Sequence, residues 1–456
     1  MTLAEQLRTI LSGPEQVSVN ETVLEHHSKD VTSYHPGVTP DVVVFPTSTE
    51  DVCRVMQYAD AHSVPVVPFG IGSSVEGQVV PVKGGISMDF TQMNNVLEVR
   101  PEDFLVRVQP GVTRMQLNQQ LKEYGLFFPV DPGADATLGG MAATNASGTT
   151  AVRYGTMRDN VLGLTVVTAD GSVIKTGGQA AKSSAGYNLT GLFVGSEGTL
   201  GTFTELTLRV YGIPEYILAA RAVFPDVGSA SQAAMGMMMC GIALDRVELV
   251  DERTINVVNN FKDTSFTEAP TLFLEFSGNK ATVDHTFLLA KEILTEEGCL
   301  ELEFDADQAA RTRMWTARHD AAFAFSASQP GKKLMTTDVC VPLSVLPDAI
   351  LEARRTIDDN GLDGAILGHV GDGNYHAVLV VDPENAEDMR RASHVNAEIV
   401  RFALERGGTC TGEHGIGLGK AKFLSAEHGD GAVKMMQQIK RAFDPKDILN
   451  PGKIFL

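Results

Sequence analysis

The sequence predicts an α+β protein with two main domains, the second of them built on a largely antiparallel sheet. Two observations carry this prediction. Residues 41–69 have the pattern of a β-α-β unit that leads into a glycine-rich run, and the composition changes near Pro214, beyond which helix-like and strand-like segments alternate. The 456 residues provide ample chain for a buried core.

The first half of the chain follows local rules for strands, helix caps and turns. Ser48 and Asp51 have the spacing of a capping box at the start of a helix, and Gly125 has the position of a helix terminator. The expected elements are, in order, a strand at 41–45, a helix from Ser48, a strand at 64–69, strand-like segments within 86–108, a helix with Leu117, Leu121 and Tyr124 on one face, and a hairpin at 164–175 around Asp170 and Gly171.

The second half contains the alternating elements of the predicted α+β domain. A methionine-rich helix around 235–239 is followed by an apolar strand at 271–276 and a helix at 282–297. Residues 300–307 alternate apolar and acidic side chains, as a strand with one wet face does.

Charge and cysteine content exclude several classes of protein. There are 37 Lys and Arg against 57 Asp and Glu, which gives a net charge of −20 and argues against nucleic acid and anionic lipid as main partners. The five cysteines form no CxxC pair, so we expect neither a disulfide framework nor an iron-sulfur cluster.

No apolar run of membrane-spanning length and no signal peptide is apparent. We expect a cytoplasmic protein without a membrane span, or one lying peripherally at the inner face of the membrane.

Three loops rich in small residues are candidates for a ligand site. The first, at 70–74, follows a predicted strand, where backbone amides can surround a phosphate. Val75 stands where the dinucleotide fingerprint would need a third glycine, and a simple tight turn explains this loop equally well. With the loops at 131–148 and 195–201, the set favours a large, bent cofactor over a single phosphate, and a turn-rich fold is the alternative.

A hairpin at 365–381 is a candidate metal site. If Asp372 and Gly373 form a two-residue turn, His369 lies directly opposite His376, with Cβ atoms about 4.5 to 5.5 Å apart. Glu413, in a glycine-rich stretch, could add a carboxylate to the two imidazoles, a ligand set that suits Zn, Mn or Fe. A surface histidine pair beside an exposed glutamate is an equally good interpretation of the spacing.

Two groups of basic residues precede this hairpin. Arg318 lies at helical spacing from Trp315 and could hold a substrate carboxylate, although a salt-bridged arginine is the more common outcome. Lys332 and Lys333 are open to the same two interpretations. HExxH and GxSxG are absent, so the familiar hydrolase signatures are missing.

Taken together, the motifs resemble the flavin-linked 2-hydroxy-acid dehydrogenases of the vanillyl-alcohol-oxidase superfamily, over nearly the whole chain. The segments that carry the resemblance are 68–74, 131–133, 139–141, 153–155, 195–201, 368–376, 412–415 and 450–453. Residues 315–318 and 337–342 look most like the cytochrome-type D-lactate dehydrogenases. The resemblance implies a two-part FAD-binding domain of the vanillyl-alcohol-oxidase type at 1–216, a cap domain at 217–412, and a segment at 413–456 that returns to the FAD domain.

The resemblance also implies the cofactor and its contacts. FAD should be bound noncovalently, because residues 70–77 contain no histidine for attachment. The expected FAD-binding residues are Pro68, Gly70, Ile71, Gly72, Ser73, Ser74, Pro132, Gly133, Thr137, Gly139, Gly140, Asn145, Ser147, Gly148, Tyr154, Gly155, Glu197, Gly198, Gly201 and Asn450.

The roles implied for the other site residues describe a metal-assisted oxidation. A divalent metal on His369, His376 and Glu413 would bind the substrate, and Arg318 would neutralise its carboxylate. His414 would take the hydroxyl proton as hydride passes to flavin N5, and Asn374 would hydrogen-bond the substrate.

The implied reaction is oxidation of a small D-2-hydroxy acid, most simply D-lactate to pyruvate, with cytochrome c, a quinone or an electron-transfer flavoprotein as acceptor. The alternatives are a glycolate or D-2-hydroxyglutarate dehydrogenase, a flavin-binding subunit of a glycolate oxidase complex, and a metallohydrolase that needs no flavin. The expectation also allows a homodimer.

Overall fold

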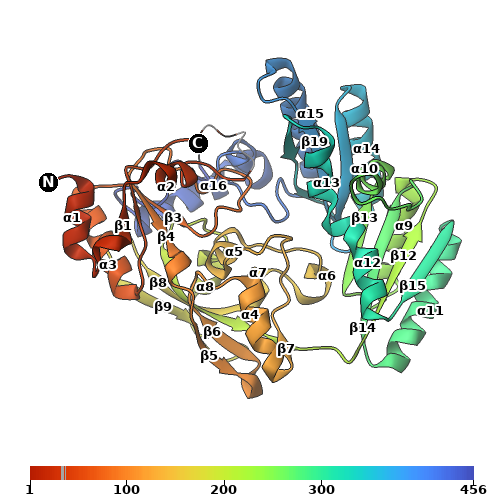
Figure 1. Cartoon of the computed structure of the whole chain (residues 1–456), viewed down its shortest axis with the longest axis horizontal. Coiled ribbons are helices and arrows are strands. Elements are labelled where there is room, and N and C mark those ends of the chain that lie inside the picture. Colours follow the sequence, from red (N-terminus) through yellow and green to blue (C-terminus); the bar gives the residue numbers. More distant parts are fainter. Residues whose placement is uncertain (32–34, 36, 456) are drawn as a thin grey trace. The chain divides into compact units, whose positions relative to one another are not determined.

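The computed structural model describes residues 1–31, 35 and 37–455, without the side chains of residues 316, 317 and 319. The described chain divides into two units (Figure 1). The first unit comprises Met1–Ser147, Gly155–Ile213 and Glu413–Leu456, and the second comprises Gly148–Tyr154 and Pro214–Gly412. The predicted α+β class with an antiparallel sheet in the second half of the chain is confirmed.

The first unit contains a mixed sheet in the order β1-β2-β4-β3. Its strands are β1 (Val17–Ser18), β2 (Val42–Val44), β4 (Ile86–Asp89) and β3 (Val66–Phe69), of which β2, β4 and β3 run parallel. Helix α3 (Thr49–His62) joins β2 to β3, and the hydroxyl of its cap Ser48 accepts the amide hydrogen of Asp51. The predicted β-α-β unit is therefore confirmed, and it places the glycine-rich loop at the end of β3.

A second sheet of the first unit is antiparallel and has the order β5-β6-β10-β8-β9. The strands are β5 (Val96–Arg100), β6 (Leu105–Val108), β10 (Thr202–Arg209), β8 (Val161–Val167) and β9 (Val173–Gly177). Val167 pairs with Val173 around a turn in which Gly171 has a φ of +78°, so the predicted hairpin is confirmed.

The remaining elements of the first unit are mostly short. Helix α4 (Arg114–Leu121) buries Leu117 and Leu121, and a 3₁₀ turn (Lys122–Tyr124) follows it and ends at Gly125, which has a φ of +66°. Tyr124, predicted on the same helix face, lies in that turn and is exposed. The others are α1 (Leu3–Ile10), α2 (Glu21–His26), α5 (Leu138–Thr144), α7 (Met157–Asn160), α8 (Leu189–Phe193), α16 (Leu424–Phe443) and the strand pair β7 (Leu126–Phe127) and β11 (Tyr211–Gly212).

The second unit is built on an antiparallel sheet in the order β15-β12-β14-β13-β18-β19-β16, with β17 also paired to β19. The strands are β12 (Tyr216–Val223), β13 (Arg246–Val250), β14 (Thr271–Gly278), β15 (Glu301–Asp305), β16 (Lys333–Thr336), β17 (Val339–Cys340), β18 (Asp363–His369) and β19 (Asn374–Val381). Strand β15 is largely exposed at one edge, which agrees with its alternating acidic sequence.

Helices cover both faces of this sheet (Figure 1). Helices α10 (Glu252–Lys262), α12 (Gln308–His319) and α13 (Ala321–Ser328) pack on one face, around Phe273 and Trp315. Helices α9 (Val227–Met239), α11 (Lys280–Glu296), α14 (Leu346–Asp359) and α15 (Ala386–Leu404) pack on the other, and α6 (Ala151–Tyr154) also belongs to this unit. The methionine-rich segment is thus a packed helix, with Met237 fully buried.

Candidate functional site

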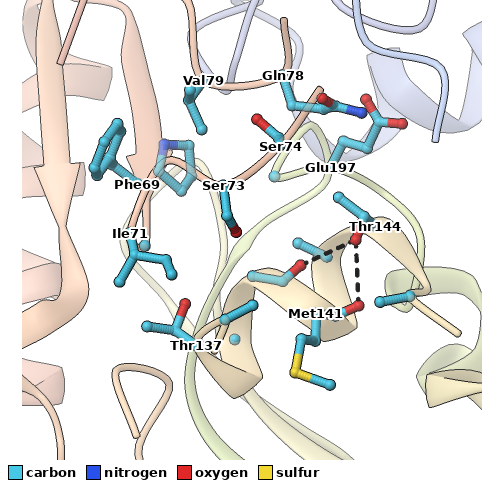
Figure 2. Close-up of a pocket in the computed structure, with 18 of the residues that line it drawn as sticks. Phe69, Ile71, Ser73, Ser74, Gln78, Val79, Thr137, Met141, Thr144 and Glu197 are labelled. Atoms are coloured by element: carbon cyan, nitrogen blue, oxygen red, sulfur yellow. Dashed lines mark hydrogen bonds between the residues drawn. The ribbon is translucent and has the colours of Figure 1, made fainter. Parts of the chain in front are cut away.

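The first unit contains a deep cavity at the end of β3. About 1250 Å³ of empty space, including its open mouth, lies between the glycine-rich loop, helix α5 and the loop around Glu197. Figure 2 shows Ile71 and Ser73 of the early loop opposite Thr137 and Met141 of the α5 region, with the Ser73 hydroxyl pointing into the space between them. Because segments far apart in the sequence, from 68–79 to Asn450, line this one space, it suits an extended ligand rather than a single ion or phosphate.

Most residues predicted to bind the cofactor line this cavity. They are Pro68, Gly70, Ile71, Gly72, Ser73, Ser74, Pro132, Thr137, Gly139, Gly140, Ser147, Glu197, Gly198, Gly201 and Asn450. All three small-residue loops therefore contribute to one site. Apolar side chains that no sequence motif indicated complete it, among them Val79, Phe90 and Phe203.

Glycine is required at two positions in the cavity wall, because a neighbouring residue lies too close to leave room for a Cβ. A Cβ on Gly70 would lie 2.3 Å from the Thr137 hydroxyl oxygen, and one on Gly198, whose φ is +71°, would lie 2.8 Å from a ring carbon of Pro68. These contacts bring backbone rather than side chains to the cavity wall, as a phosphate-containing ligand needs. The buried hydroxyl of Ser74 finds no partner among the described residues, which leaves it available to such a ligand.

Five residues of the predicted set are not among the described residues that line the cavity. Gly148 and Tyr154 belong to the second unit, and Gly133 and Gly155 are loop residues with positive φ. Asn145 ends helix α5, and its side-chain oxygen accepts the amide hydrogen of residue 158 at 2.9 Å. Direct contact of these five residues with the cofactor stays a prediction.

Glu413 and His414 lie in the wall of the same cavity. One carboxylate oxygen of Glu413 accepts a hydrogen bond from the Ser147 hydroxyl at 2.9 Å. The carbonyl oxygen of His414 accepts one from the Gln78 amide at 2.7 Å, so a residue that the sequence did not indicate holds this segment. Glu413 and His414 therefore border the space that the cofactor needs.

Glu197 fastens the segment that carries these two residues. Its buried carboxylate accepts the amide hydrogens of Ile416 at 2.6 Å and Gly417 at 2.9 Å. Burial raises the pKa of Glu197 to about 7, although these two hydrogen bonds and the charge of Lys453 oppose the rise. This residue thus links the third small-residue loop to the Glu413–His414 segment.

In the second unit, the hairpin of β18 and β19 has a register that differs from the prediction. His376 lies opposite Leu367, so His369 is its diagonal neighbour rather than its direct partner. The two-residue turns usual in hairpins need positive φ at their first central residue, here Asp372, whereas of the two residues only Gly373 has it, at +87°. A longer turn therefore closes the hairpin between His369 and Asn374.

The two histidines nevertheless share one face of the sheet. Their ring centroids are 5.5 Å apart with planes at 86°, and a nitrogen of one ring lies within 4.8 Å of a nitrogen of the other. Both side chains are buried, so the alternative of an exposed surface pair is excluded. Two imidazoles this close can ligate a common divalent ion.

Hydrogen bonds set the tautomer of both rings. Nδ1 of His369 donates to a carboxylate oxygen of Glu248 at 2.6 Å, and Nδ1 of His376 donates to the carbonyl oxygen of Thr337 at 3.2 Å. Because the acceptors carry no proton, Nδ1 of each ring carries the hydrogen, and in the neutral form of the ring the lone pair is on Nε2. This is the arrangement of metal-ligating histidines, and the chemistry of the donors fits a divalent metal.

Glu248 and Arg318 form the charged part of this site. Nε of Arg318 donates to the second oxygen of Glu248 at 2.7 Å, so the arginine has a salt bridge and further N–H groups besides. Burial acts to raise the pKa of Glu248, but the neighbouring His369 and Arg318 prevail and hold it below its usual value. The one charged residue in the apolar run 247–250 was a signal that could have identified Glu248 from the sequence.

Asn374 is held with its side-chain carbonyl oxygen unused. Its side-chain nitrogen donates to Asp338 and to the carbonyl oxygen of Val339, both at 2.8 Å. The buried side-chain oxygen has no partner among the described residues. Asn374 is therefore suited to accept a hydrogen bond from a ligand, rather than to donate one.

Comparison with known proteins identifies the family. Residues 213–454 match the family described as FAD linked oxidases, C-terminal domain, and residues 40–177 match the FAD binding domain. The chain is 46% identical to the probable mitochondrial D-lactate dehydrogenase of Danio rerio, over 97% of this chain and 90% of the relative. It is 44% identical to the mitochondrial D-lactate dehydrogenase [cytochrome] of Arabidopsis thaliana, over 99% and 80%.

More distant relatives and solved structures extend the comparison. The glycolate oxidase subunit GlcD of Bacillus subtilis is 33% identical, over 99% of this chain and 96% of the relative. The substrate-bound p-cresol methylhydroxylase has a TM-score of 0.80 at 20% identity, over 99% and 96% of the two chains, which confirms a fold of the vanillyl-alcohol-oxidase type. The chain therefore belongs to the family of FAD-linked oxidases, and it is an FAD-dependent oxidoreductase that oxidises hydroxy acids.

Proposed function

We propose that the chain oxidises a small D-2-hydroxy acid, with D-lactate as its preferred substrate, and passes the electrons to a cytochrome. The observation that carries this proposal is the buried pair His369 and His376, both with their lone pairs on Nε2, beside the cation Arg318. Such a group can bind a compact anion that also offers a hydroxyl oxygen. The names of relatives at 44% and 46% identity support D-lactate as that anion.

Each side chain has a role that its chemistry allows. Arg318 binds the substrate carboxylate through the N–H groups that Glu248 does not use, and the side-chain oxygen of Asn374 accepts a hydrogen bond from the substrate. His414 takes the hydroxyl proton. When bound, FAD supplies the acceptor for the hydride from the substrate carbon.

We propose His369, His376 and Glu413 as the residues that hold a divalent ion. The two histidines belong to the second unit and Glu413 to the first, so the complete set of three is part of the proposal. The chemistry that a Zn, Mn or Fe ion would supply there is polarisation of the substrate oxygens. Noncovalent binding of FAD belongs to the proposal as well, and release of the flavin by denaturation would support it.

The position of the lysines favours a short substrate. Lys332 and Lys333 are exposed, and Lys333 pairs with Val381, five residues beyond His376 along β19. Five residues of strand span about 17 Å, which is too far for the second carboxylate of a five-carbon acid. A monocarboxylate such as D-lactate or glycolate therefore fits better than D-2-hydroxyglutarate.

A second candidate is glycolate oxidation, either alone or as a subunit of a larger complex. The 33% identity to a protein named glycolate oxidase subunit GlcD supports it. An isolated chain that is reduced by D-lactate needs no partner for the chemical step, so turnover without partners would argue against the subunit.

Anaerobic mixing with substrate tests the proposal. D-Lactate should bleach the oxidised-flavin spectrum of the metal-loaded protein, with L-lactate as the matched control for chirality. Faster bleaching by glycolate than by D-lactate would favour the second candidate. Persistence of oxidised flavin with D-lactate, glycolate and D-2-hydroxyglutarate alike would overturn the proposed substrate class.

A further inference from the structure

Glu248 is a buried carboxylate with two separate tasks. It lies on β13 directly opposite His369 on β18, and its side chain is completely inaccessible to solvent. One oxygen accepts from His369 at 2.6 Å and the other from Arg318 at 2.7 Å. Complete burial of a carboxylate is expensive even beside a half-buried arginine, and an apolar residue at such a place is often at least as stabilising. The arrangement therefore calls for a reason other than stability.

We propose that Glu248 is a positioning residue that fixes His369 as an Nε2 ligand and holds Arg318 in place at the same time. This inference rests on the proposed function, because it assumes that His369 binds a metal and Arg318 a substrate carboxylate. A carboxylate can only accept hydrogen bonds, so Glu248 keeps the histidine proton on Nδ1. The same negative charge fixes the guanidinium at Nε and leaves its remaining N–H groups for the substrate.

The other histidine is held in a different way. Nδ1 of His376 donates to the main-chain carbonyl of Thr337 at 3.2 Å, a partner that no side-chain substitution removes. His369 depends instead on a side chain, through a shorter bond to a charged acceptor. A change at Glu248 should therefore affect one ligand of the pair and leave the other in place.

Glu248→Gln separates the two tasks because an amide has one acceptor oxygen where the carboxylate has two. If the amide oxygen faces Arg318, the amide N–H₂ faces His369, and the ring must move its proton to Nε2 or lose the bond. If the amide oxygen faces His369, the N–H₂ group meets Arg318, and the guanidinium is displaced. Either arrangement harms the site, so metal affinity should fall about 10- to 100-fold, or the KM for D-lactate should rise.

The test is metal binding by the FAD-loaded protein after removal of bound metal with a chelator. Zn²⁺ and Mn²⁺ are titrated into wild type, Glu248→Gln and the matched control Glu275→Gln. Glu275 lies on the neighbouring strand β14, where it pairs with Arg246 at 3.7 Å and contacts no histidine among the described residues. The KM for D-lactate is measured on the same metal-loaded proteins. We expect weaker metal binding or a raised KM for Glu248→Gln, and wild-type values of both for the control. FAD content should be full in both variants, since the described lining of the flavin cavity belongs to the first unit.

The outcomes separate this inference from the proposed function. Wild-type protein that binds neither ion would overturn the metal site itself. Metal binding and KM that are unchanged in Glu248→Gln, with a functional wild type, would overturn only the role of Glu248. If Glu248→Gln fails to fold, Glu248→Asp takes its place: it keeps both acceptors but is one methylene too short to reach both partners. Wild-type metal affinity and wild-type KM in that variant would equally refute the inference.

Discussion

Replacing Glu197 with Gln should flatten the pH dependence of stability of the first unit. Burial raises the pKa of Glu197 from 4.5 to about 7 in the folded protein. A raised pKa means that the folded state prefers the protonated acid. Its contribution to stability is therefore complete below pH 4.5 and is lost as the pH rises through about 7.

The size of the effect follows from that difference in pKa. The full change from 4.5 to about 7 corresponds to about 3 kcal/mol, of which about 2 to 3 kcal/mol falls between pH 5 and pH 8. Lys453, whose pKa burial lowers to about 8, adds little slope over most of this interval because it stays charged in both states. The amide side chain of the Glu197→Gln variant has no proton to lose, so this part of the slope disappears.

Urea unfolding of the protein, stripped of FAD, at about pH 5 and pH 8 measures the effect. The quantity of interest is the difference between wild type and Glu197→Gln, since titrating groups that do not interact with Glu197 cancel in it. Glu102→Gln, which changes an exposed glutamate of the same unit, is the control and should follow wild type. Equal pH slopes for wild type and Glu197→Gln would refute the reasoning.

Three further substitutions test separate parts of the site. Gly198→Ala forces a Cβ to within 2.8 Å of a proline ring carbon, at a residue whose φ is +71°. FAD content should therefore fall, and the left-handed backbone alone should lower the free energy of unfolding by about 1 to 2 kcal/mol. An unchanged ratio of flavin to protein absorbance and an unchanged melting temperature would refute this. Gly373→Ala places a Cβ against the carbonyl oxygen of Val341 and should lower the free energy of unfolding. The loss should exceed that of the control Gly407→Ala, because Gly407 also has a positive φ, of +77°, but a Cβ there would meet no atom within 4 Å. Equal losses would contradict the steric argument. His376→Ala should lower metal content and turnover while FAD content stays complete, and a variant with full metal content and full rate would show that the ligand set is wrong.

Local patterns in the sequence were enough to predict much of the fold. The capping pair Ser48 and Asp51, the turn at Gly171 and the terminator Gly125 each act within a few residues, and each is found where the pattern places it. The small-residue loops were recognisable because a backbone-lined cavity requires glycine at close contacts. Their convergence on one cavity depends on the fold, which no single loop reveals.

The parts that the sequence did not predict depend on long-range packing. The register of the His369–His376 hairpin follows from the φ of Asp372 and from the contact of Gly373 with Val341 on a different segment. Glu248 lies 121 residues from His369 in the chain, and only strand pairing brings the two together. The hydrogen bonds that fix both imidazoles are consequences of these tertiary contacts.

The most direct test of the account is the rate at which D-lactate reduces the flavin in metal-depleted and metal-restored protein under anaerobic conditions. We expect slow bleaching after chelation and recovery of the rate when Zn²⁺ or Mn²⁺ is returned, with no recovery in His376→Ala. Full-rate reduction by the depleted protein would contradict a role for the two histidines in holding a catalytic ion.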